Sequence, residues 1–498
     1  MELIQPSRTR THQTLRDHLI LSLQMDCSAT ARKINVNCQL LLLHESSGEV
    51  DHFFEVIRES CPGVSVAKWH GAMEECERDS VLNGFRSSEI SIVVGTGPAV
   101  FLPAANLCAI VVCGEENPAH FHSRHGMHFH CRDVAIERAK LENIKCLLLS
   151  QSPSVEMYHA AICGSIKMEV EKDECRSGPT VSIIDQSRLD PGKRLLSPQI
   201  LRKIEDAMET GKKNLLIHPR GGFSRSYCPR CEELFRCPQC DTPLTCVALR
   251  GGHICNRCKT ECPPNQRCHR CRGRLRRIGA GIGKVKSLLH KYFPSAIFGS
   301  SDSGDATADC DILLAENIDT AAIERIGPAT VALLDGDNLF CGRSFRSNER
   351  AHQLLWRIFD AIGEGGELLL QTTKPECAPL KHFLGGSRTS FCEEELVARR
   401  QLGYPPYRHL VVQNFSSGDG DGLKNFATRW GSALNNLTDC QWSGPKFSKC
   451  GGKRSRSEVE FCIFTADPAK FMKSLGYIRK EIGISPKTIC EKTVVDPC

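Results

Sequence analysis

Eight cysteines within 44 residues form four Cys-x-x-Cys pairs, a spacing that suits metal binding. Two residues between the cysteines let both thiolates of a pair point at one ion, and zinc takes four such ligands in a tetrahedron. Four pairs therefore predict two closed zinc sites, which stabilise a fold and leave no coordination position open for catalysis. The eight predicted ligands are Cys228, Cys231, Cys237, Cys240, Cys255, Cys258, Cys268 and Cys271.

The spacing does not fix which pairs share an ion. Only five residues separate the first two pairs, which disfavours a shared ion and favours a nested arrangement. Cys246 and Cys262 lie inside the same stretch without a paired neighbour, and we leave them out of the ligand set. In the nested arrangement, the first and last pairs hold zinc 1 (Cys228, Cys231, Cys268, Cys271) and the middle pairs hold zinc 2 (Cys237, Cys240, Cys255, Cys258).

The cysteine stretch and its C-terminal flank are strongly basic. Residues 228–291 contain fourteen Lys and Arg against four acidic residues. Each four-thiolate zinc centre adds two negative charges, and the segment stays positive after that correction. A positive surface of this kind attracts polyanions, although a solvated basic surface without a partner would have the same composition. The candidate DNA contacts are Arg272, Arg274, Arg276, Arg277 and Lys284.

The composition of the whole chain narrows its class. Its 498 residues are 41% apolar and 24% charged, which is typical of an ordinary soluble protein with two to four domains. No run approaches the 18 apolar residues of a membrane span, and the N-terminus lacks the apolar stretch of a signal peptide. We therefore expect a cytoplasmic protein in a reducing compartment, in which the scattered cysteines are free thiols.

Apolar strands alternate with amphipathic stretches along most of the chain. The first series runs from residue 39 to 150, with helical patterns at 51–59 and 133–141. A second series begins near residue 181, is interrupted by the cysteines and resumes at residue 283. This alternation predicts an α/β fold with mainly parallel sheets, followed by a small α+β domain in the last hundred residues.

Several further motifs occur in a fixed order around the cysteine stretch, and together they resemble the family of primosomal protein N′, the replication restart helicase PriA. The cysteine spacing itself is similar to that of this family. The other motifs are Arg-Asp-Val-Ala at 132–135 with 138–144, Leu-Ser-Pro at 196–198, Leu-Asp-Gly-Asp at 334–337, Phe-Arg-Ser-Asn-Glu-Arg at 345–350 with 353–355, Glu-Glu-Leu at 394–396 and Leu-Gly-Tyr-Pro-Pro-Tyr at 402–407.

The resemblance implies two RecA-like helicase lobes with the cysteine module inserted in the second. It also implies DNA, forked or single-stranded, as a partner, together with primosome and helicase-loading proteins, in a cytoplasmic, nucleoid-associated protein. The expected domains are an unassigned segment 1–39, a first lobe 40–170, a second lobe 171–227 and 272–390, a zinc module 228–271 and a C-terminal domain 391–498.

Three parts of an ATP-driven motor depart from the family pattern. The phosphate-binding sequence G-x-x-x-x-G-K-[ST] is absent, and residues 26–37, where we expect the loop, contain no glycine. The acidic motif reads Gly-Glu-Glu-Asn at 114–117, and we expect its glutamates to be solvated loop residues. Residues 360–364 lack the arginines that stabilise a transferred phosphate. These departures predict a degenerate, catalytically inactive relative of helicases, with no catalytic residues and doubtful ATP binding.

Two alternatives stay open: a DNA-dependent ATPase with an atypical nucleotide site, and a zinc scaffold that makes only protein contacts. A histidine cluster, His120, His122, His125, His128 and His130, could in principle ligate a metal. It lacks acidic partners at suitable spacing, and we expect no metal there.

Overall fold

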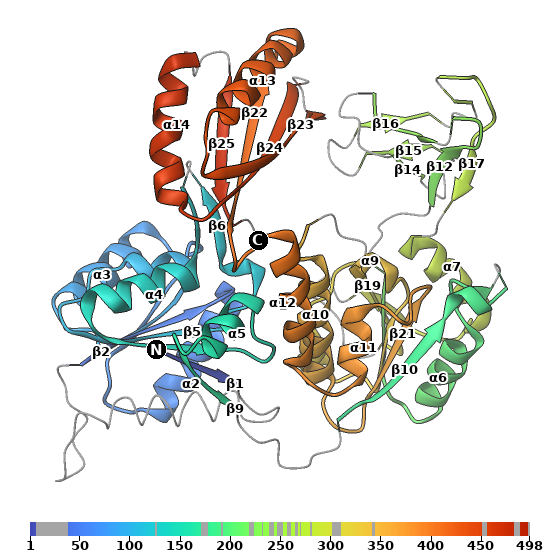
Figure 1. Ribbon diagram of the computed structural model, residues 1–498. Helices are drawn as coiled ribbons and strands as arrows, with labels where there is room; N and C mark the ends of the chain where they lie inside the picture. The colour runs from blue at the N-terminus through green and yellow to red at the C-terminus, as the bar shows by residue number, and fades with distance from the viewer. Residues whose placement is uncertain are drawn as a thin grey trace. The chain divides into compact units, whose positions relative to one another are not determined.

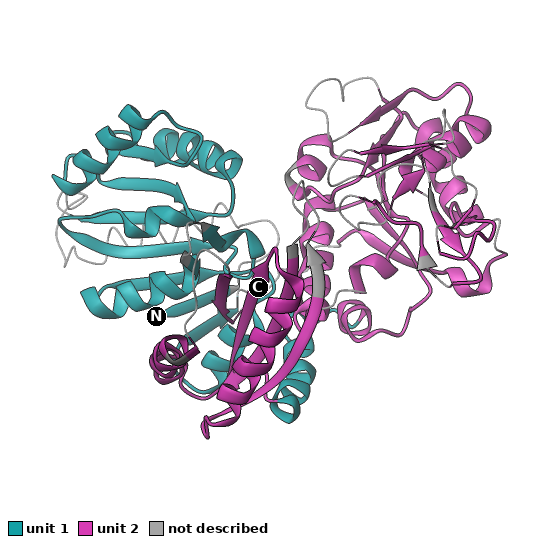
Figure 2. Cartoon of the chain, turned by 90° about the horizontal axis from the view of Figure 1, so that it is seen from above, with its two compact units in different colours: residues 1–176, 385–402, 498 teal, residues 177–384, 403–497 magenta. Residues whose placement is uncertain are grey.

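The structure is a computed structural model in which the chain divides into two compact units (Figure 2). The first unit comprises residues 1–176, 385–402 and 498, and the second comprises 177–384 and 403–497. The described residues are 1–5, 38–124, 127–170, 178–190, 193–218, 224–231, 233–238, 244–246, 252–255, 260–263, 267–268, 270–278, 281–300, 310–340, 344–450, 456–482 and 489–496.

The first unit is built on a sheet of seven parallel strands in the order β3-β4-β2-β5-β8-β1-β9. Figure 1 labels the strands β1, β2, β5 and β9 of this sheet. Continuous apolar runs such as Leu40–Leu43 form the central strands, because a parallel sheet covered by helices buries both of its faces. The strands are β1 (Glu2–Gln5), β2 (Gln39–His44), β3 (Val66–Trp69), β4 (Ile92–Thr96), β5 (Leu107–Cys113), β8 (Lys145–Leu149) and β9 (Lys167–Val170).

Helices pack on both faces of this sheet. Helix α2 (Ser47–Ser60) packs Val50, Phe53 and Ile57 against one face. Residues from α3 (Glu75–Arg86), α4 (Cys131–Glu142) and α5 (Val155–Ile162) join the core on the other face. A hairpin of β6 (Phe121–Arg124) and β7 (Met127–His130) precedes α4. The strands and helices expected between residues 39 and 150 are therefore present.

Strand β1 was not expected from the sequence, which left residues 1–39 unassigned. It lies between β8 and β9 and pairs in parallel with both, and Leu3 and Ile4 are fully buried. Parallel sheets bind ligands at the carboxyl ends of their strands. A phosphate-binding loop in this sheet would therefore come directly after β1, and not directly before β2. The predicted loop segment 26–37 lies outside the described residues.

The expectation that all scattered cysteines are free thiols is wrong at one place. Cys38, just before β2, and Cys108 in β5 form a disulfide with their Cα atoms 5.8 Å apart. The parallel pairing of β2 with β5 brings the two residues together, although 70 positions separate them in the sequence.

The second unit contains a sheet of six parallel strands in the order β10-β21-β20-β11-β19-β18. Helices α6 (Pro198–Glu209) and α7 (Ile282–Tyr292) pack on one face, and α8 (Thr320–Ile326), α10 (Ser347–Ile362) and α11 (Ala378–Leu384) on the other, while α9 (Asp337–Phe340) follows β20. The strands are β10 (Thr180–Asp185), β11 (Asn214–Ile217), β18 (Phe298–Ser300), β19 (Ile312–Ala315), β20 (Thr330–Leu333) and β21 (Glu367–Thr372).

The cysteine module is inserted between β11 and α7. Short strands form its sheet in the order β13-β12-β14-β15-β16, and the sixth strand, β17, pairs with β12. They are β12 (Ser224–Cys228), β13 (Glu233–Leu234), β14 (Thr245–Cys246), β15 (His253–Ile254), β16 (Glu261–Cys262) and β17 (Arg276–Ile278). The module has its own small core around Phe235 and Leu244.

The last part of the chain begins with helix α12 (Ser390–Leu402), which groups with the first unit. An antiparallel sheet then follows in the order β23-β24-β22-β25, and α13 and α14 share one core with it. Its elements are β22 (His409–Ser417), α13 (Gly420–Asn435), β23 (Cys440–Cys450), β24 (Arg456–Thr465), α14 (Pro468–Ile482) and β25 (Cys490–Val495).

The fold class predicted from the sequence is confirmed: two RecA-like α/β lobes with parallel sheets, a cysteine module in the second lobe and a C-terminal α+β part. The exact domain boundaries stay predictions. Within the described part of the chain, no helix has both the length and the apolar character needed to cross a membrane.

Candidate metal centre and its basic surroundings

The outer two cysteine pairs meet in one cluster. The sulfur atoms of Cys228, Cys231, Cys268 and Cys271 all lie within 4.8 Å of one another. The Sγ atoms of Cys228 and Cys271 are 3.5 Å apart, and those of Cys231 and Cys268 are 3.9 Å apart. Four sulfurs bound to one zinc ion at about 2.3 Å are about 3.8 Å apart in a regular tetrahedron. The cluster therefore has the dimensions of a four-thiolate metal site.

Two tight turns place these cysteines. The first turn follows β12 and carries Cys228 and Cys231. In the second, the amide of Cys268 donates to the carbonyl of Gly273, and the amide of Arg272 donates to the carbonyl of Cys268. Arg272 has a left-handed backbone (φ 59°), which closes the turn directly after Cys271. A Cβ atom on Gly273 would lie 3.1 Å from the sulfur of Cys271, so this position favours glycine.

The chemistry of the cluster favours a bound cation. Hydrogen bonding with Cys271, together with burial, raises the pKa of Cys231 to about 12 when only thiols face one another. A thiol must lose its proton to ligate a metal, and a divalent ion supplies the positive charge that stabilises four thiolates at close range. These four residues can therefore hold a metal ion.

The middle cysteine pairs are only partly described. Cys237 and Cys255 are buried in the small module core, while Cys240 and Cys258 lie outside the described residues. Among the described residues, the cluster of the outer pairs is the one group of three or more potential ligands close enough for a metal. The second zinc site thus stays a prediction.

Arginines surround the outer cluster. The side chains at the candidate positions Arg272, Arg274 and Arg276 are exposed, and Lys284 is exposed on helix α7. Arg277 pairs through its backbone with Ser226, and its side chain lies outside the described residues. The structure adds three exposed arginines next to the cysteine turns that the sequence analysis did not single out: Arg230, Arg267 and Arg270.

The acidic motif is buried, and the expectation of solvated glutamates is wrong. Glu115 has no exposed surface; its carboxylate accepts from Arg132 Nη1 at 2.9 Å and from the Ser154 amide at 2.7 Å. Glu116 accepts from the hydroxyl of Ser150 at 2.7 Å. Burial raises the pKa of Glu115, although Arg132 and Ser154 favour its charged form. These contacts lie at the carboxyl ends of β5 and β8, and the sequence analysis missed the two serines.

The histidine cluster does not gather into a metal site within the described residues. His120 is fully buried, and its Nε2 donates to the carbonyl of Cys113 at 2.8 Å. The Nδ1 atom of His130 accepts from the amide of Arg132 and caps helix α4. His125 lies outside the described residues. The described contacts of His120 and His130 are structural.

Comparison with known proteins shows which proteins the chain is similar to. The chain is 29% identical to the replication restart protein PriA of Chlamydia muridarum over 86% of its own length, and 28% identical to that of Chlamydia trachomatis. The PriA protein of Bacillus subtilis is 27% identical over 71% of the chain. The chain spans 61% of the length of the chlamydial relatives and 47% of the Bacillus subtilis protein. No family model matches the chain.

Solved structures that the chain matches include RecG bound to a three-way DNA junction, with a TM-score of 0.43 and 12% identity, covering 80% of this chain and 43% of RecG. The helicase MrfA bound to DNA gives a TM-score of 0.43 and 9% identity over 77% of this chain and 48% of MrfA.

Two RecA-like lobes with an inserted cysteine module give the chain the fold of a helicase-type protein. Its similarity to PriA proteins from several bacteria, over most of its own length, supports the PriA family that the sequence motifs indicate.

The prediction that the chain is not an enzyme is contradicted by these matches. It relied on missing motif residues, whereas similarity over 86% of the chain necessarily includes most of both lobes. The absence of individual motif residues was therefore not sufficient evidence for the prediction that the chain is not an enzyme.

Proposed function

We propose that the chain acts in replication restart: it binds DNA at stalled or abandoned forks and promotes primosome assembly and reloading of the replicative helicase. The observation that carries this proposal is the similarity to replication restart proteins PriA over 86% of the chain. The chain spans 61% of the length of that relative. We therefore base the proposed role on the two lobes and the cysteine module.

The cysteine module is the proposed DNA contact. Two zinc ions would hold it, one in the outer cluster and one between the middle pairs. Exposed arginines at 272, 274 and 276 lie within a few residues of Cys271, so the metal site would fix the backbone that presents them. Arginine contacts to phosphates give binding that is strong at low salt and nearly independent of sequence.

Salt dependence tests the DNA contact. Forked DNA should bind to the unchanged chain with an affinity that falls steeply with salt. Replacing Arg272, Arg274 and Arg276 together by alanine should reduce the slope of log affinity against log salt by about 2 to 3. A matched triple variant, Arg202→Ala, Lys212→Ala and Arg325→Ala, removes three exposed cations from helices and loops of the second lobe and should leave the slope unchanged.

The result that would overturn the DNA contact is an equal slope for both triple variants, or no fork binding at low salt. Binding alone would leave the restart role open, so a reconstituted assay must also measure loading of the replicative helicase onto a fork. Loading at the rate of a reaction without the chain would contradict the proposed role.

One observation favours a second activity, DNA-dependent ATP hydrolysis. The network of Glu115, Arg132 and Ser154 orders the carboxyl ends of β5 and β8, the edge at which open α/β sheets bind ligands. Glu116 lies beside this network with its carboxylate on Ser150. ATP turnover that forked DNA stimulates and that Glu116→Gln reduces would support this activity. Turnover equal to a blank, with and without DNA, would exclude it.

A further inference from the structure

The strand at one edge of the first sheet is open along one side. Within the described residues, β3 pairs only with β4. The carbonyl of Ser65, directly before β3, accepts from the amides of Ser91 and Ile92 next to and in β4. Backbone groups alternate in direction along a strand, so Val66 and Lys68 present their N–H and C=O groups to the open side. An unpaired edge of this kind is a template for another strand.

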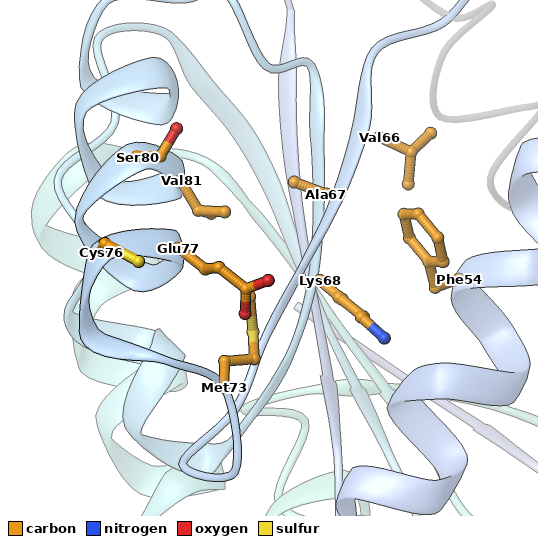
Figure 3. A pocket seen from close by; sticks show the side chains of 9 residues that line it. All are labelled: Phe54, Val66, Ala67, Lys68, Met73, Cys76, Glu77, Ser80 and Val81. Atoms are coloured by element: carbon orange, nitrogen blue, oxygen red, sulfur yellow. The ribbon is translucent and has the colours of Figure 1, made fainter.

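A pocket of about 500 Å³ surrounds this edge (Figure 3). In Figure 3, the side chain of Phe54 from α2 lies on the same side of the strand as Val66 and Lys68. Glu77 and Val81 from α3 lie on the other side, with Met73 from the loop before α3 at the lower end. A strand added to β3 would therefore direct alternate side chains toward α2 and toward α3.

The surface around the pocket is acidic, although the whole chain has a net charge of +6. Its few cations are partly neutralised, because Lys68 pairs with Asp51 at 2.6 Å and Arg58 pairs with Glu55. Helices α2 and α3, strand β3 and the residue before α3 carry eight acids against four cations: Glu49, Asp51, Glu55, Glu59, Glu74, Glu75, Glu77 and Asp79 against Arg58, Lys68, Arg78 and Arg86.

We propose that the open edge of β3 is a docking site for an extended, basic segment of a partner protein, which adds a strand to the sheet. Backbone hydrogen bonds to Val66 and Lys68 supply affinity. The apolar side chains of the segment lie on one face, beside Phe54 or Val81, and its lysines or arginines lie on the opposite face, toward the acids of the other helix. The proposal does not depend on the restart role.

The negative charge of this surface favours a basic segment, and not a second copy of the chain, as the occupant. Two β3 edges paired with each other would bring two acidic faces together, and like charges across an interface oppose association. A basic peptide is attracted by the same negative charges.

Synthetic peptides test the docking site in the full-length chain. A labelled peptide that alternates lysine with valine should bind, as measured by fluorescence anisotropy. The same peptide with N-methylated amides on alternate residues keeps its charge but cannot pair as a strand, and should bind at least about tenfold more weakly. A glutamate–valine peptide should also bind at least about tenfold more weakly. Amide exchange at Val66 and Lys68 should slow when the lysine–valine peptide is bound.

A matched pair of variants links this binding to β3. Val66→Pro removes an outward-facing amide and should weaken binding about tenfold or more. Val170→Pro makes the same substitution in β9, at the opposite edge of the same sheet, where the amide of Lys167 faces β1 and that of Val170 faces outward. It should leave binding unchanged. Circular dichroism checks that both variants are folded.

Three results would overturn the proposal. The N-methylated peptide could bind as tightly as its parent, which would reduce the effect to general charge attraction. The two proline variants could bind equally. Finally, Val66 and Lys68 could exchange slowly in the chain without peptide, which would show that residues of the chain itself or a second copy already cover the edge.

Discussion

The outer cysteine cluster illustrates how single residues carry the proposed metal chemistry. Sulfur separations of 3.5 Å and 3.9 Å arise between cysteines that are 43 and 37 positions apart in the sequence, and both match a single tetrahedral ion. The sequence could predict the ligand types from their spacing. It could not settle which pairs meet, because that depends on how β12 and the second turn fold back on each other.

Replacing one cysteine of the cluster should release its metal. We expect Cys228→Ser to lose one zinc ion per chain and to loosen the module, because a structural zinc contributes roughly 10 kcal/mol or more of folding free energy. Metal analysis of the purified protein measures the stoichiometry. Cys246→Ser is the matched control, since Cys246 is buried in the same small sheet but lies outside the cluster. Full metal retention in Cys228→Ser would contradict the assignment.

His120 should make stability depend on pH. Burial lowers the pKa of His120 from an ordinary value of 6.5 to about 4. The unfolded chain therefore takes up a proton first as the pH falls, and this stabilisation is present above pH 6.5 and lost as the pH falls from 6.5 to about 4. The expected loss from this residue is about 3 kcal/mol.

Denaturant unfolding between pH 7 and pH 4 measures this effect in the first lobe. His120→Gln keeps a donor for the carbonyl of Cys113 but does not titrate, so its unfolding free energy should fall by about 3 kcal/mol less over this range. His52→Gln is the control, because His52 is exposed. Equal pH profiles for both variants and the unchanged chain would disprove the role of His120.

At the scale of elements, long buried strands and amphipathic helices could be predicted from the sequence, while two short or displaced elements could not. Strand β1 has only four residues, and neither its length nor its composition distinguishes it from a loop. Helix α12 was not predicted either, because its residues stood out only through the motif Glu-Glu-Leu at 394–396, and the surface on which it packs depends on the fold. Periodicity shows which side of an element is apolar, and partners are decided by the tertiary fold.

A buried arginine, Arg399, links helix α12 to helix α5 within the first unit. The side chain of Arg399 bonds Glu395 at 2.9 Å and Glu156 of α5 at 3.1 Å, and its exposed fraction is 2%. Removing one partner of a buried ion pair typically costs about 3–5 kcal/mol, because the remaining charges lose their compensation. We therefore expect Arg399→Ala to speed amide exchange throughout α12. Arg400→Ala changes an exposed neighbour and should have little effect; equal exchange in the two variants would contradict the anchoring role.

At the scale of the whole molecule, the hydrophobic cores are separate. Each lobe buries its apolar side chains on the two faces of its own sheet, and the C-terminal part has a further core around Trp430 and Phe461. The module's core is much smaller, with four buried residues, two of which are cysteines. So small a core rarely supports a fold without metal or disulfides.

Metal removal should therefore unfold the module and spare the lobes. After treatment with a zinc chelator under reducing conditions, we expect amides in β12 and β14–β17 to exchange rapidly while those in β2, β5, β11 and β20 keep their protection. Fork binding should weaken as much as in the triple arginine variant or more, because the turns that hold Arg272 and Arg274 would lose their fixed backbone. Readdition of zinc should restore both signals. Loss of protection in the lobes at the same chelator concentration would show that the ions stabilise the whole chain and not the module alone, and unchanged exchange in the module would remove metal from the account of its fold.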